Sequence, residues 1–458
     1  MGKYDEYARI KSGDKEIDKR VVKTLEQLSS EPSASISRAC GDPHQSKAVY
    51  RLLSNMKFQT EQVVRVSAEE SHKKLVISGC EIVLIVQDTS ALDYGHLRAS
   101  EEMGAINMNE KSRGLLLHSA IGVGIDNEIY GLMGQEIMIR PPESYGKKHQ
   151  RKKKPIEAKE SYKWLKMMEE TQENIPAGVT GVHVSDREGD IYEYFERCEQ
   201  LGSKYLCRRT YNRKIKSDSG ASEYIDNYIN GLSEAGEMSV HVPRDSHTKR
   251  PAREAKISVK FGTVDILRPR DMKLTNKSNL KKLTVYVISA VEKDAPPNVK
   301  EPVSWQLVTN IPVESFSDAV EKIDWYTKRW RIEDFHYTLK SGCSIEKRQA
   351  SSREKIEKLI ALYSVIAVDI LSMTWLARAK PDDSCEILFD EDEWKILYCV
   401  ANKTKKVPAT APTVHEAVGF VAMLGGFLAR KSDGEPGVKS IWRGLSKLRA
   451  ILFAKNFF

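Results

Sequence analysis

The residues best suited to chemistry are three carboxylates spread along the chain: Asp88, Asp186 and Glu333. The first two each close an apolar run that is typical of a strand, EIVLIVQ and VTGVHVS, and strand ends are where sheets place functional residues. Such a set offers hard oxygen ligands, which prefer Mg²⁺ or Mn²⁺ to zinc. Two such ions can drive in-line displacement at phosphorus. For either aspartate alone, a strand-end turn residue is the alternative interpretation.

The glutamate lies in the segment WYTKRWRIEDFHYTLK, residues 325–340. At about 100° per residue of a continuous helix, Tyr326, Arg329, Glu333 and Lys340 fall within an arc of roughly 60°. A carboxylate that can bind a divalent ion is thus aligned with three groups that can hold phosphate oxygens. The pattern predicts phosphodiester chemistry. An exposed helix face with an ordinary i,i+4 ion pair is the alternative.

The surrounding pattern predicts the elements that position these residues. Strands are expected at 81–88, 115–124, 129–138 and 179–185, with a helix at 161–174 before the last of them. This order, by analogy, is that of a ribonuclease-H-like α/β core, in which acids at the ends of the first and fourth strands meet one from a later helix.

The rest of the chain divides around that core. The first sixty or so residues predict helices at 15–28 and 45–55. A helix at 191–201 and a strand at 204–208 precede an antiparallel β-insertion at about 211–310, with strands MSVHV, AKISVKF, VDILR and LTVYVISAV. Helical periodicity returns at 317–341 and continues to the C-terminus. We therefore expect domains at 1–66, 67–378 and 379–458.

Composition restricts the class of protein. The net charge of +8 is concentrated in runs such as 147–154 (KKHQRKKK), which indicate a polyanionic partner unless the run is merely a solvated loop. Seven scattered cysteines without a C-x-x-C pair indicate neither a zinc ribbon nor a disulfide framework, and favour a reducing cytoplasm. No apolar segment marks the N-terminus for secretion. The apolar stretch 359–376 contains Asp369 and predicts a core helix rather than a membrane span.

The other titratable residues near these motifs are expected to have structural rather than catalytic or metal-binding roles. Glu188 and Asp190 are alternative acids, but we expect them to organise the turn and the start of the next helix. His118 is expected to be structural, and His183 and His336 lack the spacing of a zinc site.

Several motifs along the chain are specific to one family of proteins. The spacing Tyr326-x2-Arg329-x3-Glu333-x6-Lys340 resembles the Y-R-E-K signature of bacterial insertion-sequence transposases of the IS-four family, nearest the branch with the Tn-five transposase. The similarity extends over nearly the whole chain, through GDPHQSKAVYRLLSN, QDTSALDY, NEKSRGLLLHS, KESYKW, VSDREGDIY, RPAREA and LGGF.

The resemblance implies a cut-and-paste DNA transposase that binds and cleaves the inverted-repeat ends of double-stranded DNA and joins them to target DNA. It implies a homodimer in the bacterial cytoplasm, associated with the nucleoid, with no membrane partner. It implies that 1–66 binds the DNA end and 379–458 dimerises. The implied DDE metal triad, using Mg²⁺ or Mn²⁺, is Asp88, Asp186 and Glu333. The implied DNA-binding residues are Tyr326, Arg329, Lys340, Trp305 and Arg208.

Some positions leave alternatives open. Trp305 matches the tryptophan that stacks on a flipped base during hairpin formation, although a strand core residue is the other interpretation. Arg209 is an alternative to Arg208. Tyr337 stands where a second lysine is expected, and the N-terminal part is shorter than in relatives. A non-catalytic DNA-end-binding or inhibitory relative is the competing function, and a stand-alone nuclease is a third.

Overall fold

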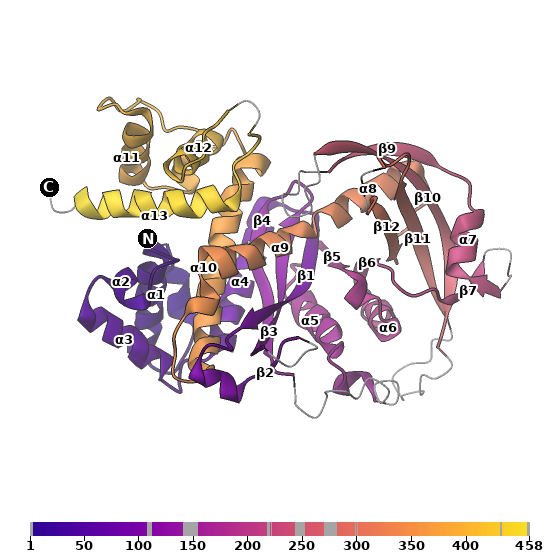
Figure 1. Cartoon of the computed structure of the whole chain (residues 1–458), viewed down its shortest axis with the longest axis horizontal. Coiled ribbons are helices and arrows are strands. Elements are labelled where there is room, and N and C mark those ends of the chain that lie inside the picture. Colours follow the sequence, from indigo (N-terminus) through magenta and orange to yellow (C-terminus); the bar gives the residue numbers. More distant parts are fainter. Residues whose placement is uncertain are drawn as a thin grey trace.

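The computed structural model describes residues 3–107, 112–140, 154–217, 220, 222–242, 252–269, 282–297, 299, 301–430 and 433–455. Residues 147–153 of the basic run, and Arg250 and Pro251 of the RPAREA motif, lie outside the described residues. Figure 1 shows N-terminal helices, a long sheet with helices on its faces, and a C-terminal group of helices above the N-terminal ones.

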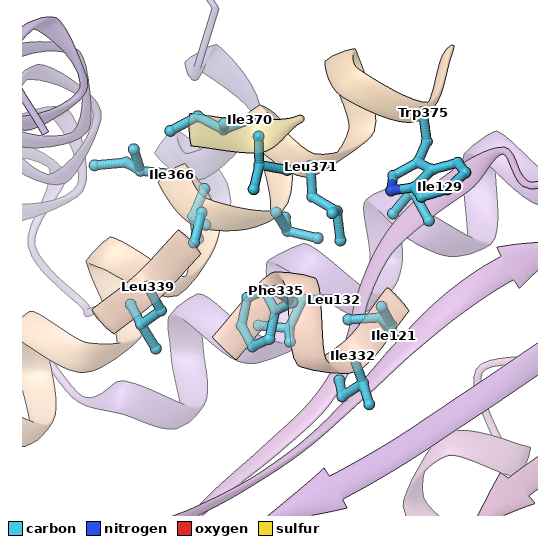
Figure 2. Packing of buried hydrophobic residues seen from close by; sticks show 14 of the residues in the cluster. Ile121, Ile129, Leu132, Ile332, Phe335, Leu339, Ile366, Ile370, Leu371 and Trp375 are labelled. Carbon is cyan, nitrogen blue, oxygen red and sulfur yellow. The ribbon is translucent and has the colours of Figure 1, made fainter. Parts of the chain in front are cut away.

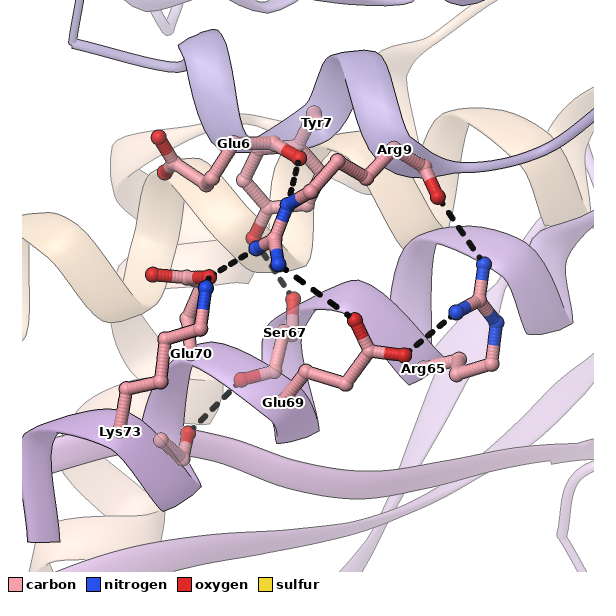
Figure 3. A network of polar contacts seen from close by, with 9 residues as sticks. Glu6, Tyr7, Arg9, Arg65, Ser67, Glu69, Glu70 and Lys73 are labelled. Carbon is pink, nitrogen blue, oxygen red and sulfur yellow. Dashed lines mark hydrogen bonds and ion pairs between the residues drawn. The ribbon is translucent and has the colours of Figure 1, made fainter. Parts of the chain in front are cut away.

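The N-terminal helices begin and end where their capping residues predict. They are η1 (Asp5–Arg9), α1 (Lys15–Ser30), α2 (Ile36–Cys40), α3 (Pro43–Leu53) and α4 (Thr60–Ser78). Gly41, at φ 65°, ends α2, and the Asp42 side chain accepts from the His44 backbone N–H at the start of α3. In Figure 3, η1 is held against α4 by the Tyr7 hydroxyl, 2.7 Å from that of Ser67, and by an ion pair between Arg9 and Glu70. Helix α4 runs through residue 66, where the sequence predicted a domain limit.

The first part of the sheet carries the predicted core. Its elements are β1 (Ile82–Asp93), η2 (Arg98–Glu102), β2 (Gly104–Ala105), β3 (Arg113–Gly124), β4 (Ile129–Met138), η5 (Ile156–Ala158), α5 (Tyr162–Gln172), β5 (Thr180–Ser185), η6 (Arg187–Gly189), α6 (Tyr192–Leu201) and β6 (Lys204–Arg208). The strands lie in the order β4–β3–β1–β5–β6, antiparallel from β4 to β1 and parallel from β1 to β6. The prediction that β1 ends at Asp88 is wrong, because β1 continues to Asp93 by pairing with β3 alone.

The β-insertion extends this same sheet. It contains β7 (Lys214–Ser217), β8 (Ser222–Tyr224), α7 (Ile225–Gly231), β9 (Gly236–Val242), β10 (Arg253–Leu267), β11 (Lys282–Glu292) and β12 (Ser304–Thr309). Strand β12 pairs antiparallel with β6, so the described strands form one 12-stranded mixed sheet. AKISVKF and VDILR were predicted as two strands but form the single strand β10. Gly262 between them stays paired with Val287 of β11 and has Tyr228 packed over it.

Helices follow the sheet to the end of the described chain. They are α8 (Phe316–Thr327), α9 (Trp330–Tyr337), the π-helical turn η7 (Thr338–Gly342), η8 (Ile345–Lys347), α10 (Arg353–Ala379), η9 (Cys385–Ile387), α11 (Glu391–Asn402), α12 (Val414–Leu424) and α13 (Val438–Lys455). The helical periodicity predicted at 317–341 is confirmed, but it does not form one continuous helix. Tight i→i−3 bonds from the Lys328 and Arg329 N–H groups interrupt it, and the wider η7 turn ends it, so an arc computed for one regular helix does not hold.

Helix α10 packs between the N-terminal helices, the sheet and the C-terminal helices. Among the described helices it is the one long and apolar enough to cross a membrane, but 83% of its apolar window is buried, as in a core helix. Figure 2 shows α9 and η7 side chains (Ile332, Phe335 and Leu339) packed between the α10 side chains and those of β3 and β4. Lys358 of α10 also donates to the Asn55 carbonyl at 2.9 Å, which ties the N-terminal helices to α10.

The apolar residues of the C-terminal helices mostly pack inside the chain. Ile441, Trp442, Leu445 and Leu448 of α13 are buried, and α13 contacts α10, α11 and α12. The family resemblance implied that residues 379–458 dimerise. These four residues pack within the chain, whereas Phe453 at the end of α13 remains exposed.

Candidate active site

Two neighbouring strands present the aspartates at matched positions. The parallel pairing of β1 with β5 ends at Val86 opposite Val184, and Asp88 and Asp186 each follow two residues later. Because side chains alternate along a strand and parallel strands lie about 4.8 Å apart, the two carboxylates share one face at the same edge of the sheet. Each is fixed by a backbone N–H: Thr89 donates to Asp88 and Glu188 donates to Asp186, both at 2.8 Å.

The third carboxylate comes from α9, which packs on β1 and β3 through its buried Ile332 and Phe335. Glu333 lies one turn from Arg329, the residue just before α9, and the Arg329 Nη2 is 2.6 Å from the Glu333 Oε1. Arg329 is only 7% exposed, whereas the Glu333 side chain remains partly open to solvent. The helix therefore brings one buried cation and one accessible carboxylate to the edge where the aspartates lie.

The three acids share Arg329 as an electrostatic neighbour. Burial, together with the negative charges of Asp186 and Glu333, raises the pKa of Asp88 to about 6, although the Thr89 N–H and Arg329 act to lower it. Burial likewise raises the pKa of Asp186, again opposed by Arg329. Burial would lower the pKa of Arg329, but Tyr326, Glu333 and Asp88 outweigh it, so this pKa is raised. The guanidinium is thus the shared counter-charge of the three acids.

The donor set suits a divalent cation in its chemistry. All three side chains offer carboxylate oxygens, the ligands that Mg²⁺ and Mn²⁺ prefer, and the mutual repulsion felt by Asp88 is relieved by any added positive charge. As the side chains stand, no group of three His, Cys, Asp or Glu residues in the described ranges is close enough together to hold an ion. Glu333 instead holds Arg329, so binding a cation would require it to exchange that partner.

An aromatic and cationic cluster borders the carboxylates. Tyr326, at the end of α8, is 2% exposed; its ring centroid lies 6.1 Å from that of Trp305 on β12, and the Arg329 guanidinium lies over it at 5.9 Å. Trp305 is half-buried and packs at the margin of the main core. The predicted DNA contacts Tyr326, Arg329 and Trp305 are therefore brought together, beneath rather than on an open helix face.

The remaining predicted contacts lie at the margins of the cluster. Arg208, at the end of β6, donates from Nη2 to the Ser304 carbonyl at 2.8 Å, beside Trp305. Arg209 is buried and paired with Asp226 at 2.5 Å, which favours Arg208 as the residue free to meet a ligand. Lys340 lies in the η7 turn, partly exposed, with its Nζ 4.0 Å from the Glu346 carboxylate.

Sequence reasoning missed two residues behind the aspartates. The Lys163 ammonium, in the KESYKW motif, is buried and lies 3.1 Å from the Glu188 carboxylate. Its charge lowers the pKa of Asp186. Thr89 lies beside Asp88, and its hydroxyl is 2.9 Å from the His118 Nδ1. Burial holds the pKa of His118 well below its usual value, in agreement with a structural role. A motif position alone signalled Lys163; nothing in the sequence signalled the Thr89 contact.

The two alternative acids are engaged elsewhere. Asp190 is fully buried, pairs with Arg213, and accepts from the Thr210 and Tyr211 backbone N–H groups at 2.7 and 2.8 Å. Asp190 therefore holds the segment after β6. The sequence had instead predicted that it would organise the start of α6. Glu188 pairs with Lys163.

Three family models match the chain in order. Residues 4–58 match the transposase DNA-binding family, residues 162–368 the transposase DDE domain, and residues 365–456 the transposase Tn5 dimerisation domain. The chain belongs to the Tn5-like DDE transposases. This membership confirms the family resemblance found in the sequence. The DDE domain match includes Asp186 and Glu333 and begins after Asp88.

A solved structure is also similar to this chain. It is a cryo-EM structure of a piggyBac transposase synaptic complex with hairpin DNA, 9% identical, with a TM-score of 0.34. The similarity covers 82% of this chain and 54% of that one, so the chain spans about half of its length.

Proposed function

We propose that this chain is a cut-and-paste DNA transposase, which binds the inverted-repeat ends of its element, cleaves them and joins them to target DNA. The observation that carries the proposal is the convergence of three carboxylate charges, from β1, β5 and α9, around the buried Arg329. A protein that only bound DNA would gain nothing from acids at this position, because they repel phosphate.

We propose a ribonuclease-H-like core for the catalytic part. It is supported by the order β4–β3–β1–β5–β6, with one parallel half and one antiparallel half. The proposed division is 1–66 for end binding, 67–378 for catalysis with the insertion at about 211–310, and 379–458 for dimerisation. The work would be done in the bacterial cytoplasm, at the nucleoid, by a homodimer.

Asp88, Asp186 and Glu333 are proposed as the residues that hold Mg²⁺, or Mn²⁺ in its place. When bound, a pair of such ions supplies an activated attacking oxygen and a stabilised leaving oxygen. Within this chain, the Thr89 and Glu188 N–H groups orient the two aspartates. Arg329, once Glu333 exchanges its partner, has its guanidinium free to bind the scissile phosphate.

The neighbouring cations and aromatics are proposed to hold the DNA end. Arg329 and Lys340 would contact phosphates, with the Tyr326 hydroxyl, and Arg208 would contact the backbone beside β12. Trp305 would stack on a flipped base if a hairpin intermediate forms, a role supported by its half-buried ring next to Tyr326.

The test uses the purified full chain, Mg²⁺ or Mn²⁺, and linear DNA carrying the element's own inverted repeats. We expect nicks at the repeat ends followed by joined products on a denaturing gel. End binding without any cut in either ion would instead identify a non-catalytic relative. Cut ends that are never joined to a second DNA would identify a stand-alone nuclease.

A further inference from the structure

A groove of about 590 Å³ lies outside the candidate active site, between the C-terminal helices and the end of the catalytic segment. Its walls include Tyr337 and Ser341 on one side and three basic residues of α13, Lys439, Arg443 and Lys447, on the other. The three basic residues are exposed and four positions apart, so they form one ridge along α13 with about 6 Å of helix rise between neighbours. We call Lys439, Arg443 and Lys447 the basic ridge.

The basic ridge differs from the other charged helix faces of this protein. Basic residues on α8 to α11 commonly pair with an acid one turn away, as Lys328 does with Asp324 and Lys395 with Glu391. Within the described part of the chain, no ion pair joins the ridge side chains to an acid. Arg443 instead has a lysine one turn away on both sides, and like charges at this spacing destabilise a helix. An anion in the groove would offset that repulsion.

Close packing fixes the ridge relative to the catalytic segment. A Cβ on Gly444 would lie 1.8 Å from the Val421 carbonyl oxygen, so α13 crosses α12 at backbone contact. Trp442 packs against Gly342 at the end of η7, and its ring centroid is 5.6 Å from that of Tyr337. Tyr337 itself is 43% exposed. The groove is thus held at a set distance from Glu333.

We propose that the basic ridge, with Ser341 and Tyr337, binds the phosphate backbone of DNA next to the cleaved end. This inference rests on the proposed function for the identity of the DNA. Ser341 lies about two helical turns after Glu333, roughly 10 Å along the path, which corresponds to about three or more phosphates along one strand.

The test compares Arg443→Gln/Lys447→Gln with the matched control Lys405→Gln/Lys406→Gln, which removes two exposed lysines from the segment after α11. Binding of an inverted-repeat duplex is measured by fluorescence anisotropy over a range of salt concentrations, without divalent ions. For two lost contacts the slope of log K against log salt should become shallower by about 1.8 in the ridge variant. The control should keep the wild-type slope. Matching urea midpoints confirm that both variants fold.

Neutral methylphosphonates locate the contact. Placed three to five phosphates from the cleavage position, they should weaken wild-type binding but add little to the loss in the ridge variant. An unchanged salt slope in the ridge variant, or fully additive losses, would overturn the proposal. Unchanged DNA binding with a loss of self-association in analytical ultracentrifugation would overturn it too, and assign the ridge to a second copy. If the wild-type chain binds no DNA end at all, it is the proposed function that fails.

Discussion

Asp190 and Asp88 are both acids of the sheet edge, yet the structure predicts opposite effects of neutralising them. Asp190 is fully buried, is paired with Arg213, and accepts two backbone N–H groups. Removing one partner of a buried ion pair costs roughly 3–5 kcal/mol. In Asp190→Asn an amide oxygen still accepts from the backbone, so we expect the lower end, about 3 kcal/mol of lost unfolding free energy.

Asp88→Asn should behave differently. Burial raises the pKa of Asp88 to about 6, which means that the ionised carboxylate is less stable in the folded protein than in the unfolded chain. A raised carboxyl pKa contributes stability that is fully present below the unfolded pKa and is lost as the pH rises through 6. At pH 7.5 the neutral amide should therefore cost no stability and should increase it.

The assay is urea unfolding at pH 7.5 in a chelator, followed by intrinsic fluorescence. Asp190→Asn should lower the midpoint at an unchanged slope, and Asp88→Asn should leave it equal or higher. The reasoning is refuted if Asp190→Asn is as stable as the wild type. It is equally refuted if Asp88→Asn loses as much as Asp190→Asn, because Asp88 would then be a structural residue.

Further predictions concern pH and DNA. Burial lowers the pKa of His183 from 6.5 to about 3, so its contribution to stability is present above pH 6.5 and is lost as the pH falls below that value. The loss of unfolding free energy between pH 7.5 and 5.5, measured by urea unfolding, should be smaller by about 1.4 kcal/mol in His183→Gln than in the wild type. Equal losses in the two proteins would contradict this. Trp305→Ala should slow a step after first-strand nicking by the loss of roughly 1–3 kcal/mol of base stacking, and a defect in nicking alone would make Trp305 a core residue. Lys340→Ala should flatten the salt dependence of end binding by about one counterion, whereas an unchanged slope would leave it a solvated lysine.

The sequence predicted the strands of the core closely, because buried strands are continuous β-branched runs. The bounds of β4 and β6 agree with the prediction, and the positions of Asp88 and Asp186 followed from the ends of such runs. The predicted helix bounds were wrong where the backbone departs from a regular helix, as it does between α8, α9 and η7. Nothing in the residue pattern of 325–340 signalled the tight turn at Arg329 or the π-helical η7.

Long-range packing was also beyond the pattern. The β-insertion was recognised from its alternation, but its pairing through β12 to β6 depends on partners a hundred residues apart. The burial of Trp442 depends on Gly342 in the same way. The sequence therefore could not show which apolar residues of α13 the chain buries within itself.

The central claim is that Asp88, Asp186 and Glu333 act together as one catalytic set. The most direct test measures cleavage of inverted-repeat DNA in Mg²⁺ by Asp88→Asn, Asp186→Asn and Glu333→Gln, with Glu188→Gln as the matched control acid. The account predicts that the three variants bind the DNA end but cut none of it, while Glu188→Gln still cuts. Cleavage at the wild-type rate by any one of the three would contradict it.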